Sequence, residues 1–108
     1  MNAQRKRQAG DVIYQVDWCP AKDAEKLRSE DPEAWPAEHC TRTATFDDFC
    51  TAEKFACEAV KSDWYGSCSL SQEMCENPKY GWWENQANWS VEKGMNPGDL
   101  DPAKPDYR

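Results

Sequence analysis

The chain has few of the residues from which most domains build a core. Leu, Ile, Val and Phe together account for eleven of its 108 residues. A share below roughly 20%, combined with high charge, is typical of chains that do not fold alone. Six tryptophans and six cysteines offset this shortage, because tryptophan buries a large area and disulfides stabilise small domains. These totals predict one small domain with a thin core, held by disulfides and completed by partner surfaces.

Signals of catalysis are also missing. The sequence contains no Gly-rich phosphate loop, no pairing of a nucleophile with a base, and no two carboxylates in an apolar setting. It has one histidine, His39, and no Cys-x-x-Cys spacing of the kind that zinc and redox sites use. We therefore expect no enzymatic activity, no metal and no cofactor. A zinc-dependent interaction domain with free thiols is the alternative interpretation of the cysteines.

Charge and hydropathy limit the partners. No window approaches the ~20 apolar residues of a transmembrane helix, and no apolar segment of a secretory signal follows the basic start. The net charge of −7 disfavours nucleic acid. Arg5, Lys6 and Arg7 are either a solvated terminus or a peripheral contact with anionic lipid, worth about 1 kcal/mol per cation. We expect protein partners, no nucleic acid and no membrane span.

Residues 11–18, DVIYQVDW, alternate with the period of two that an extended strand shows. A lone strand leaves its backbone unpaired, so this segment is expected either as an ordered coil or as an added strand at the edge of a partner's sheet. We assign residues 1–18 to an extended N-terminal arm, in which Tyr14 and Trp18 are candidate partner contacts.

Residues 45–60 show the clearest helical pattern. The 3.6-residue period places Cys50 and Cys57 on one apolar face and Phe55 on the opposite face, where we expect it to contact a partner. A second, shorter helix is expected to end before Pro78. The fold class predicted from these patterns is mainly α: a short, disulfide-stapled antiparallel helical hairpin with long extended N- and C-terminal arms.

The cysteine spacing predicts how the two helices pair. Two cysteines in each expected helix are seven residues apart, and seven residues advance a helix by about 10.5 Å and return nearly to the same face. Antiparallel helices would bring these cysteines together at two heights, and each bridge would contribute about 3 kcal/mol. Among the fifteen connectivities that six cysteines allow, this geometry favours the pairs Cys57–Cys68, Cys50–Cys75 and Cys19–Cys40.

The rest of the chain is expected to be irregular. Residues 77–108 are rich in Pro, Gly, Asn and Asp, and we interpret them as a tail. Trp82, Trp83 and Trp89 lie in it, either as anchors in a partner, since interfaces favour Trp, or folded back over the hairpin. The predicted organisation is an arm (1–18), a stapled helical region (19–76, with the hairpin over 45–76) and a tail (77–108).

A resemblance to a known family rests on two further spacings. Cys40 and Cys50 form a Cys-x9-Cys motif, and Cys57 and Cys68 form a Cys-x10-Cys motif. Over residues 40–75 the chain resembles the twin-cysteine helical hairpins of the mitochondrial intermembrane space, the coiled-coil-helix-coiled-coil-helix proteins. The resemblance implies pairing of Cys40 with Cys68 and of Cys50 with Cys57, which differs from the pairing that helix geometry favours. It also implies import without a cleaved presequence, followed by oxidation.

Together these patterns predict a non-catalytic structural accessory subunit that stabilises a large complex. The family resemblance makes a mitochondrial respiratory-chain complex, in the intermembrane space, the first choice. Two alternatives stay open: a lumenal subunit of a photosynthetic complex in the thylakoid, and a small secreted disulfide-rich binding module that acts outside the cell.

Overall fold

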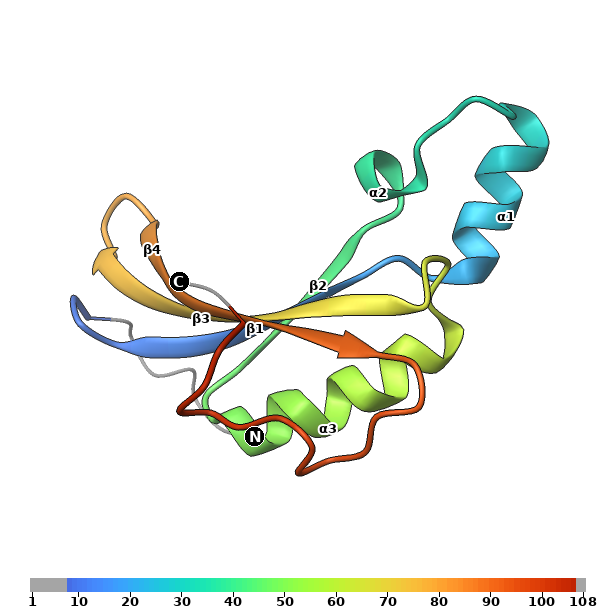
Figure 1. Ribbon diagram of the computed structural model, residues 1–108. Helices are drawn as coiled ribbons and strands as arrows, with labels where there is room; N and C mark the ends of the chain where they lie inside the picture. The colour runs from blue at the N-terminus through green and yellow to red at the C-terminus, as the bar shows by residue number, and fades with distance from the viewer. Residues whose placement is uncertain (1–7, 107–108) are drawn as a thin grey trace, which may run out of the picture.

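An antiparallel sheet forms the centre of the molecule (Figure 1). The structure is a computed structural model that describes residues 8–106, and within them the sheet has four strands in the order β2-β1-β3-β4. The strands are β1 (Val12–Trp18), β2 (Arg42–Phe46), β3 (Ser67–Asn77) and β4 (Trp82–Glu92). The connecting helices are α1 (Ala21–Glu30), α2 (Pro36–His39), α3 (Phe49–Ala59) and the 3-10 turn η1 (Val60–Ser62).

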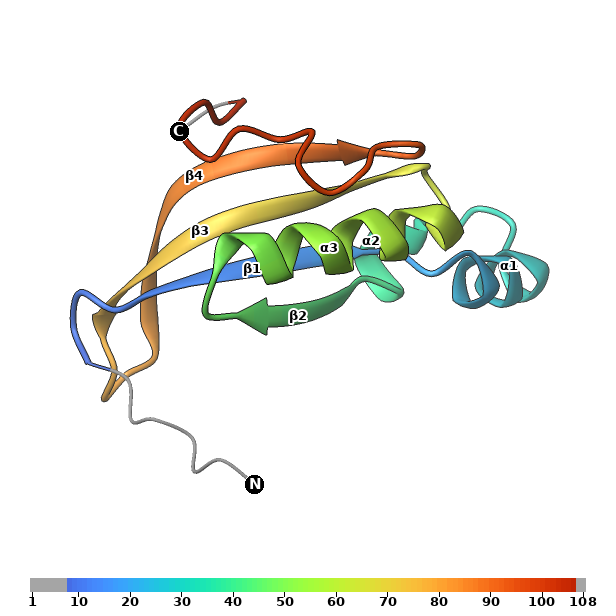
Figure 2. The same cartoon turned by 90° about the horizontal axis from the view of Figure 1, so that it is seen from below.

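The place of α3 follows from the strand order. β2 and β3 both pair with β1 in antiparallel fashion, so they run parallel to each other on either side of it. Parallel strands need a crossover of about a dozen or more residues, usually a helix. Figures 1 and 2 show α3 lying along one face of the sheet, whereas α1 and α2 rise on the other side at one end.

The start of α3 is fixed by a side-chain cap. Asp48 precedes the helix, and its carboxylate accepts hydrogen bonds from the hydroxyl of Thr51 at 2.7 Å and from its backbone N–H at 3.0 Å. These bonds to Thr51 lower the pKa of Asp48. The stability that the cap contributes is therefore present at neutral pH and is lost as the pH falls through this lowered pKa.

The face of the sheet toward α3 carries the core. Val16, Leu70 and Trp89, from three neighbouring strands, are at most 2% exposed. Ala52 and Ala56 of α3 are fully buried in the same cluster. Their small side chains allow the helix to approach the sheet closely, which is how a chain with few aliphatic residues reaches dense packing.

Aromatic rings fill the ends of this interface. Phe49 lies edge-on to Trp89, with ring centroids 5.0 Å apart. Phe55 lies edge-on to Trp18 at the same centroid distance, and Phe46 is 5.1 Å from Phe55. Such pairs contribute roughly 0.5–1.5 kcal/mol beyond the burial of their area. Aromatic packing therefore supplies part of what the missing Leu, Ile and Val residues would supply.

The C-terminal segment, residues 93–106, packs against the chain itself (Figure 2). The indole nitrogen of Trp89 donates a hydrogen bond to the carbonyl of Asp101 at 2.9 Å. The backbone N–H of Leu100 donates to the carboxylate of Glu53 in α3 at 3.0 Å. The segment thus covers α3 and β4.

This architecture contradicts the expected mainly helical hairpin with extended arms. The first expected helix, residues 45–60, is present in its larger part as α3, although its first two residues end β2. The residues of the second expected helix form β3, and the tail expected over residues 77–108 contains β4. The strand expected in residues 11–18 is present as β1, yet it lies between β2 and β3 of the chain's own sheet. It therefore does not extend the sheet of a partner.

The spacing of two apolar residues explains the error in β3. Leu70 and Met74 are four residues apart, which fits one face of a helix and equally one face of a strand, because four is a multiple of two. The serines on either side of Leu70, Ser69 and Ser71, then occupy the other face of the strand. The period of two decides between the interpretations, because it accounts for the serines as well as for the apolar residues.

The same change of element removes the expected disulfides. All six cysteines lie in the described part of the chain, and all six are free thiols. Residues seven apart share a face of a helix but lie on opposite faces of a strand, because seven is odd. Cys68 faces α3, where its thiol donates to the carbonyl of Ala56 at 3.7 Å, so Cys75 is directed to the other face. The ladder of two matched bridges therefore cannot form.

The attachment of the C-terminal segment can be tested at Glu53. This residue is 4% exposed, and replacing it with Ala leaves the partly buried N–H of Leu100 without its acceptor. We expect the free energy of unfolding in urea to fall by about 1–3 kcal/mol, with faster hydrogen exchange at Leu100. The matched control is Lys54→Ala, at an exposed neighbour on α3, which should change stability by less than about 0.5 kcal/mol. Equal losses in both variants would contradict the contact.

Candidate binding site on the open face of the sheet

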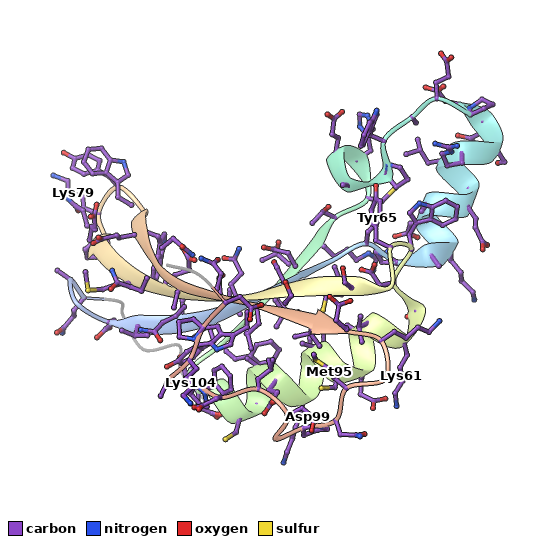
Figure 3. All side chains as sticks on the ribbon, viewed as in Figure 1. Lys61, Tyr65, Lys79, Met95, Asp99 and Lys104 are labelled. Carbon is purple, nitrogen blue, oxygen red and sulfur yellow. The ribbon has the colours of Figure 1, made fainter. Side chains whose placement is uncertain are left out.

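The sheet has a second face, which we call the open face, turned away from α3 (Figures 1 and 3). In an antiparallel sheet, residues paired across strands share a face, as do residues two apart along one strand. The register therefore assigns the following residues to the open face: Ile13, Gln15, Asp17, Thr43, Thr45, Ser67, Ser69, Ser71, Glu73, Cys75, Trp83, Asn85, Asn88, Ser90 and Glu92.

The open face is polar and acidic. Apart from Ile13, Cys75 and Trp83, its side chains are hydroxyls, amides and carboxylates, and among the described residues no Lys or Arg belongs to this set. Ile13, Ser71 and Cys75 are buried, so the accessible part of the face is its polar remainder. The carboxylates are Asp17, Glu73 and Glu92. A surface that carries one sign of charge attracts ligands of the opposite sign. This face is therefore suited to cations and repels anions.

Hydrogen bonds orient two of these carboxylates. The side-chain amide of Gln15 donates to Asp17 at 3.2 Å, and the hydroxyl of Thr43 also donates to Asp17. The side-chain amide of Asn85 donates to Glu73 in the same way. These donors are neutral, and in the described part of the chain neither carboxylate belongs to an ion pair. Their negative charge is thus held in place without being cancelled.

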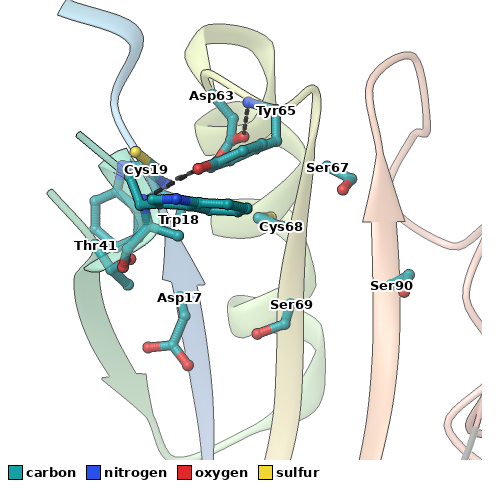
Figure 4. A pocket seen from close by; sticks show the side chains of 12 residues that line it. Asp17, Trp18, Cys19, Thr41, Asp63, Tyr65, Ser67, Cys68, Ser69 and Ser90 are labelled. Carbon is teal, nitrogen blue, oxygen red and sulfur yellow. Dashed lines mark hydrogen bonds between the residues drawn. The ribbon is translucent and has the colours of Figure 1, made fainter. Parts of the chain in front are cut away.

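A pocket of about 490 Å³ opens at the end of this face that is nearest α2 (Figure 4). Among the described residues that line it, three are aromatic, two are carboxylates, and none is Lys, Arg or His. Its described lining consists of Asp17, Trp18, Cys19, Trp35, Ala37, Thr41, Asp63, Tyr65, Ser67, Cys68, Ser69 and Ser90. The pocket therefore combines aromatic surface with negative charge.

Asp63 holds the walls of the pocket together. It follows η1, is 7% exposed, and pairs with Pro20 in an isolated β-bridge. One carboxylate oxygen accepts the backbone N–H of Cys19 at 2.7 Å, and the other accepts the N–H of Tyr65 at 2.7 Å (Figure 4). Charge-assisted bonds of this kind are roughly twice as strong as neutral ones. The end of β1 and the turn before β3 are thus tied to one side chain.

Tyr65 connects this turn to α2. Its hydroxyl accepts the backbone N–H of Ala37 at 3.2 Å, while its ring lines the pocket. The next residue, Gly66, has a φ of +75° and donates its N–H to the carbonyl of Asp63 at 3.3 Å. A residue with a Cβ is disfavoured at that φ, so the tight turn that aims Tyr65 at α2 depends on glycine.

Two thiols beside the pocket are poor nucleophiles. Burial is the main cause that raises the pKa of Cys19 to about 11 and that of Cys68 to about 12, and the charge of Asp63 raises both further. The thiols of Cys19 and Cys40 are also hydrogen-bonded to each other. Because the thiolate is the reactive form, Cys19 and Cys68 stay protonated and unreactive near neutral pH.

The far end of the open face carries a second group of exposed rings, at the tip of the β3–β4 hairpin. Tyr80 and Trp82 are 61% and 60% exposed, with ring centroids 5.6 Å apart. The ammonium of Lys79 lies 5.5 Å from the centroid of Tyr80. Figure 3 labels Lys79 at this end and Tyr65 at the other, both on the side of the sheet away from α3.

The residues predicted to bind partners are scattered by the fold. Trp89 is buried in the core, and Tyr14 and Phe55 are half-buried and pack against it. Trp18 lines the pocket, and Trp82 stands exposed at the hairpin tip. Trp83 is half-buried beside it.

Of the predicted cysteine pairs, Cys19 and Cys40 lie in contact, and Cys57 is close enough to Cys68 for its charge to raise the pKa of that thiol.

Among the charged and aromatic residues that line the pocket, four were not predicted as site residues. Asp17 occupies one of the polar positions in the alternating pattern of β1. Its place on the face away from the core could therefore be predicted once that strand was assigned to a sheet. Asp63 and Tyr65 lie in SDWYG, which the sequence marked as a turn without indicating what the turn contacts. Trp35 lies in a Pro-punctuated loop, where no sequence signal identifies a site.

Comparison of the chain with protein-family models, with curated proteins and with solved structures finds no match in any of the three. Within residues 8–106, no three His, Cys, Asp or Glu side chains are grouped so that they could hold a metal ion. No helix in that range has both the length and the apolar character that a membrane crossing requires. The basic cluster Arg5, Lys6 and Arg7, expected to contact lipid, lies outside the described residues.

The state of the thiols gives a direct test of this geometry. Cys50 is exposed, Cys40 is half-buried and the other four cysteines are buried. With excess iodoacetamide at about pH 8, we expect Cys50 to be alkylated first and Cys68 to stay protected, because its pKa is raised to about 12. Mass spectrometry with peptide mapping identifies the modified residues.

The control for this test is Cys50→Ser, which should abolish the fast phase of alkylation. After unfolding without reductant, all six thiols should react. Recovery of fewer than six would reveal a disulfide and contradict the free thiols, and rapid native modification of Cys68 would contradict its burial.

Proposed function

We propose that this chain is a non-catalytic binding module that holds an extended, positively charged segment of a partner protein on its open face. The observation that carries the proposal is an acidic, polar sheet face with exposed aromatic rings at both ends. Binding is favoured over catalysis by two observations. Two thiols are buried and have raised pKa values, and the carboxylates of the open face accept hydrogen bonds on an accessible surface.

The length of the open face favours an extended ligand. β3 runs along the whole face and contains eleven residues, which at about 3.3 Å each span roughly 35 Å. An extended peptide of about ten residues covers that length. A small molecule would reach one end and leave the other without a ligand.

The exposed rings mark the two ends of such a ligand. Trp35 and Tyr65, beside the pocket, are 68% and 49% exposed, and the pair Tyr80 and Trp82 at the hairpin tip is similarly accessible. Protein interfaces concentrate their binding energy in Trp, Tyr and Arg. Hence the rings supply apolar anchors, and the polar strand residues between them supply hydrogen bonds.

Charge selects the kind of segment. The chain carries a net charge of −7, and the open face contributes carboxylates without a compensating cation among its described residues. A segment rich in Lys or Arg is attracted to this surface and steered toward it, whereas acidic segments and nucleic acids are repelled. An uncharged oligosaccharide would gain the aromatic contacts but not the electrostatic ones.

A non-catalytic role in protein binding keeps the coarser part of the function expected from the sequence. The respiratory-chain role is not carried over, because it depended on a disulfide-stapled helical hairpin, and the described residues form a sheet with free thiols. The expected locations in the intermembrane space, the thylakoid lumen or outside the cell stay predictions, since no observation tests them.

The proposal is tested with peptide probes and a pair of charge variants. We expect a decapeptide of alternating Lys and Ser to bind the full chain in calorimetry, and its Glu–Ser counterpart not to bind. Asp17→Asn combined with Glu73→Gln keeps an acceptor oxygen at each site but removes two charges from the open face. This variant should weaken binding by about tenfold, and added salt should weaken binding to the parent chain further.

The control variant removes two charges elsewhere. Glu30→Gln with Glu58→Gln changes exposed residues of α1 and α3 and should leave the affinity within about twofold of the parent value. If both double variants lose the same affinity, the open face is not the site. Binding of a neutral oligosaccharide in place of the Lys–Ser peptide, without dependence on salt, would also refute the proposal.

A further inference from the structure

We infer that the pocket at the α2 end is a receptor for one organic cation, the ammonium or guanidinium head group of a Lys or Arg side chain in the bound segment. This inference rests on the proposed function and adds to it which part of the ligand is recognised. The pocket joins the open face directly, because Asp17, Ser69 and Ser90 belong to both. A segment lying on the face therefore passes over its mouth.

Aromatic residues line the pocket from three separate parts of the chain, but the ring of Trp18 packs on Phe55 of α3, so that Trp35 and Tyr65 are the rings offered to a ligand. Trp18 ends β1, Trp35 precedes α2, and Tyr65 lies in the turn before β3. The face of an aromatic ring attracts a cation placed within about 6 Å of its centre, and Trp is the most effective ring. Trp35 and Tyr65 keep much of their surface exposed, so their rings have room for a ligand.

Two carboxylates supply the negative charge. Asp63 is buried at the back of the pocket and Asp17 lies on the sheet beneath its mouth (Figure 4). The hydrogen bonds that Asp63 accepts from backbone N–H groups orient it but leave its charge uncancelled, and in the described part of the chain neither carboxylate belongs to an ion pair. A cation in the pocket would form an ion pair that neither carboxylate has among residues 8–106.

The neighbouring thiols respond to the same carboxylates. Besides burial, the charge of Asp63 contributes to the raised pKa of both Cys19 and Cys68, and Asp17 contributes at Cys68. The negative potential of this site disfavours any anion, including a thiolate. The same potential favours a cation. Carboxylate, phosphate and sulfate ligands are thereby excluded.

Three other features of the molecule are weaker candidates. The rings at the hairpin tip lie beside Lys79, and the positive charge of this residue disfavours a second cation there. The contact between Cys19 and Cys40 lies against the pocket, but both are free thiols and nothing in the structure supplies an oxidant. The outer edge of β2 is short, and nothing shows what would pair with it. The pocket combines shape, rings and charge.

The test uses small probes and the isotope-labelled full chain. N-acetyl-lysine amide, N-acetyl-arginine amide and tetramethylammonium are titrated, and the indole resonances of Trp18 and Trp35 and the amide of Tyr65 are followed by NMR. We expect these resonances to shift saturably. N-acetyl-norleucine amide, which has a similar chain without the charge, should shift them weakly or not at all. Equal shifts with the neutral probe would overturn the inference.

Two variants locate the effect, each with a matched control. Trp35→Ala should weaken cation binding about twofold to fivefold, whereas Trp64→Ala, which removes an exposed ring that does not line the pocket, should not change it. Asp17→Asn should weaken it to a similar extent and lessen its salt dependence, whereas Glu58→Gln should not. Trp35 is exposed, so its variant is expected to fold, and Asp63 is left intact because it holds the pocket walls.

Failure of this inference can be told apart from failure of the proposed function. If the Lys–Ser decapeptide binds and Asp17→Asn with Glu73→Gln weakens it, while the small cations leave Trp18, Trp35 and Tyr65 unshifted, the open face binds cationic segments without a head-group pocket. If neither the peptide nor the small cations bind, both proposals are refuted.

Discussion

The carboxylate of Asp63 joins the two parts of the molecule. It accepts the N–H of Cys19, where β1 leaves the sheet toward α1 and α2, and the N–H of Tyr65, where the chain returns to begin β3. Tyr65 in turn accepts the N–H of Ala37 at α2, and Cys19 accepts the N–H of Trp64 at 2.8 Å. One buried side chain thus fixes both the sheet and the helical limb, and the pocket exists only because the two are held together.

The alternation of β1 and β3 builds the core and the open face at once. One set of positions, including Val16 and Leu70, packs on α3, and the other set, including Asp17 and Ser69, faces away. A strand that gives half its positions to a polar surface has few left for the core, so other parts of the chain must cover it. Tightly packed alanines, edge-on aromatic pairs and the C-terminal segment do so. Stability thus does not depend on disulfides, which composition alone had suggested.

Local patterns identified some of this fold and misled on the rest. β1 followed from its period of two, and α3 from its apolar stripe, because each signal lies within one segment. β3 was misread because its apolar spacing of four fits both periods, and the error in β3 then produced the wrong cysteine geometry. The site depends on contacts across 44 residues, between Cys19 and Asp63, and no local pattern encodes such a pairing. Trp35 and Tyr65 were therefore beyond sequence reasoning, whereas Asp17 was within it.

The electrostatics of the pocket argue for binding as opposed to reaction. A nucleophilic thiol needs positive charge nearby to stabilise the thiolate, whereas Asp63 and the surrounding burial raise the pKa of Cys19 and Cys68. The same field lowers the free energy of any cation brought to the rings of Trp35 and Tyr65. Binding and titration are then coupled reciprocally, because a bound cation would lower the thiol pKa values by as much free energy as the thiolates would add to its affinity. The acidic residues that help to keep these cysteines protonated are therefore the ones that would make the pocket selective for cations.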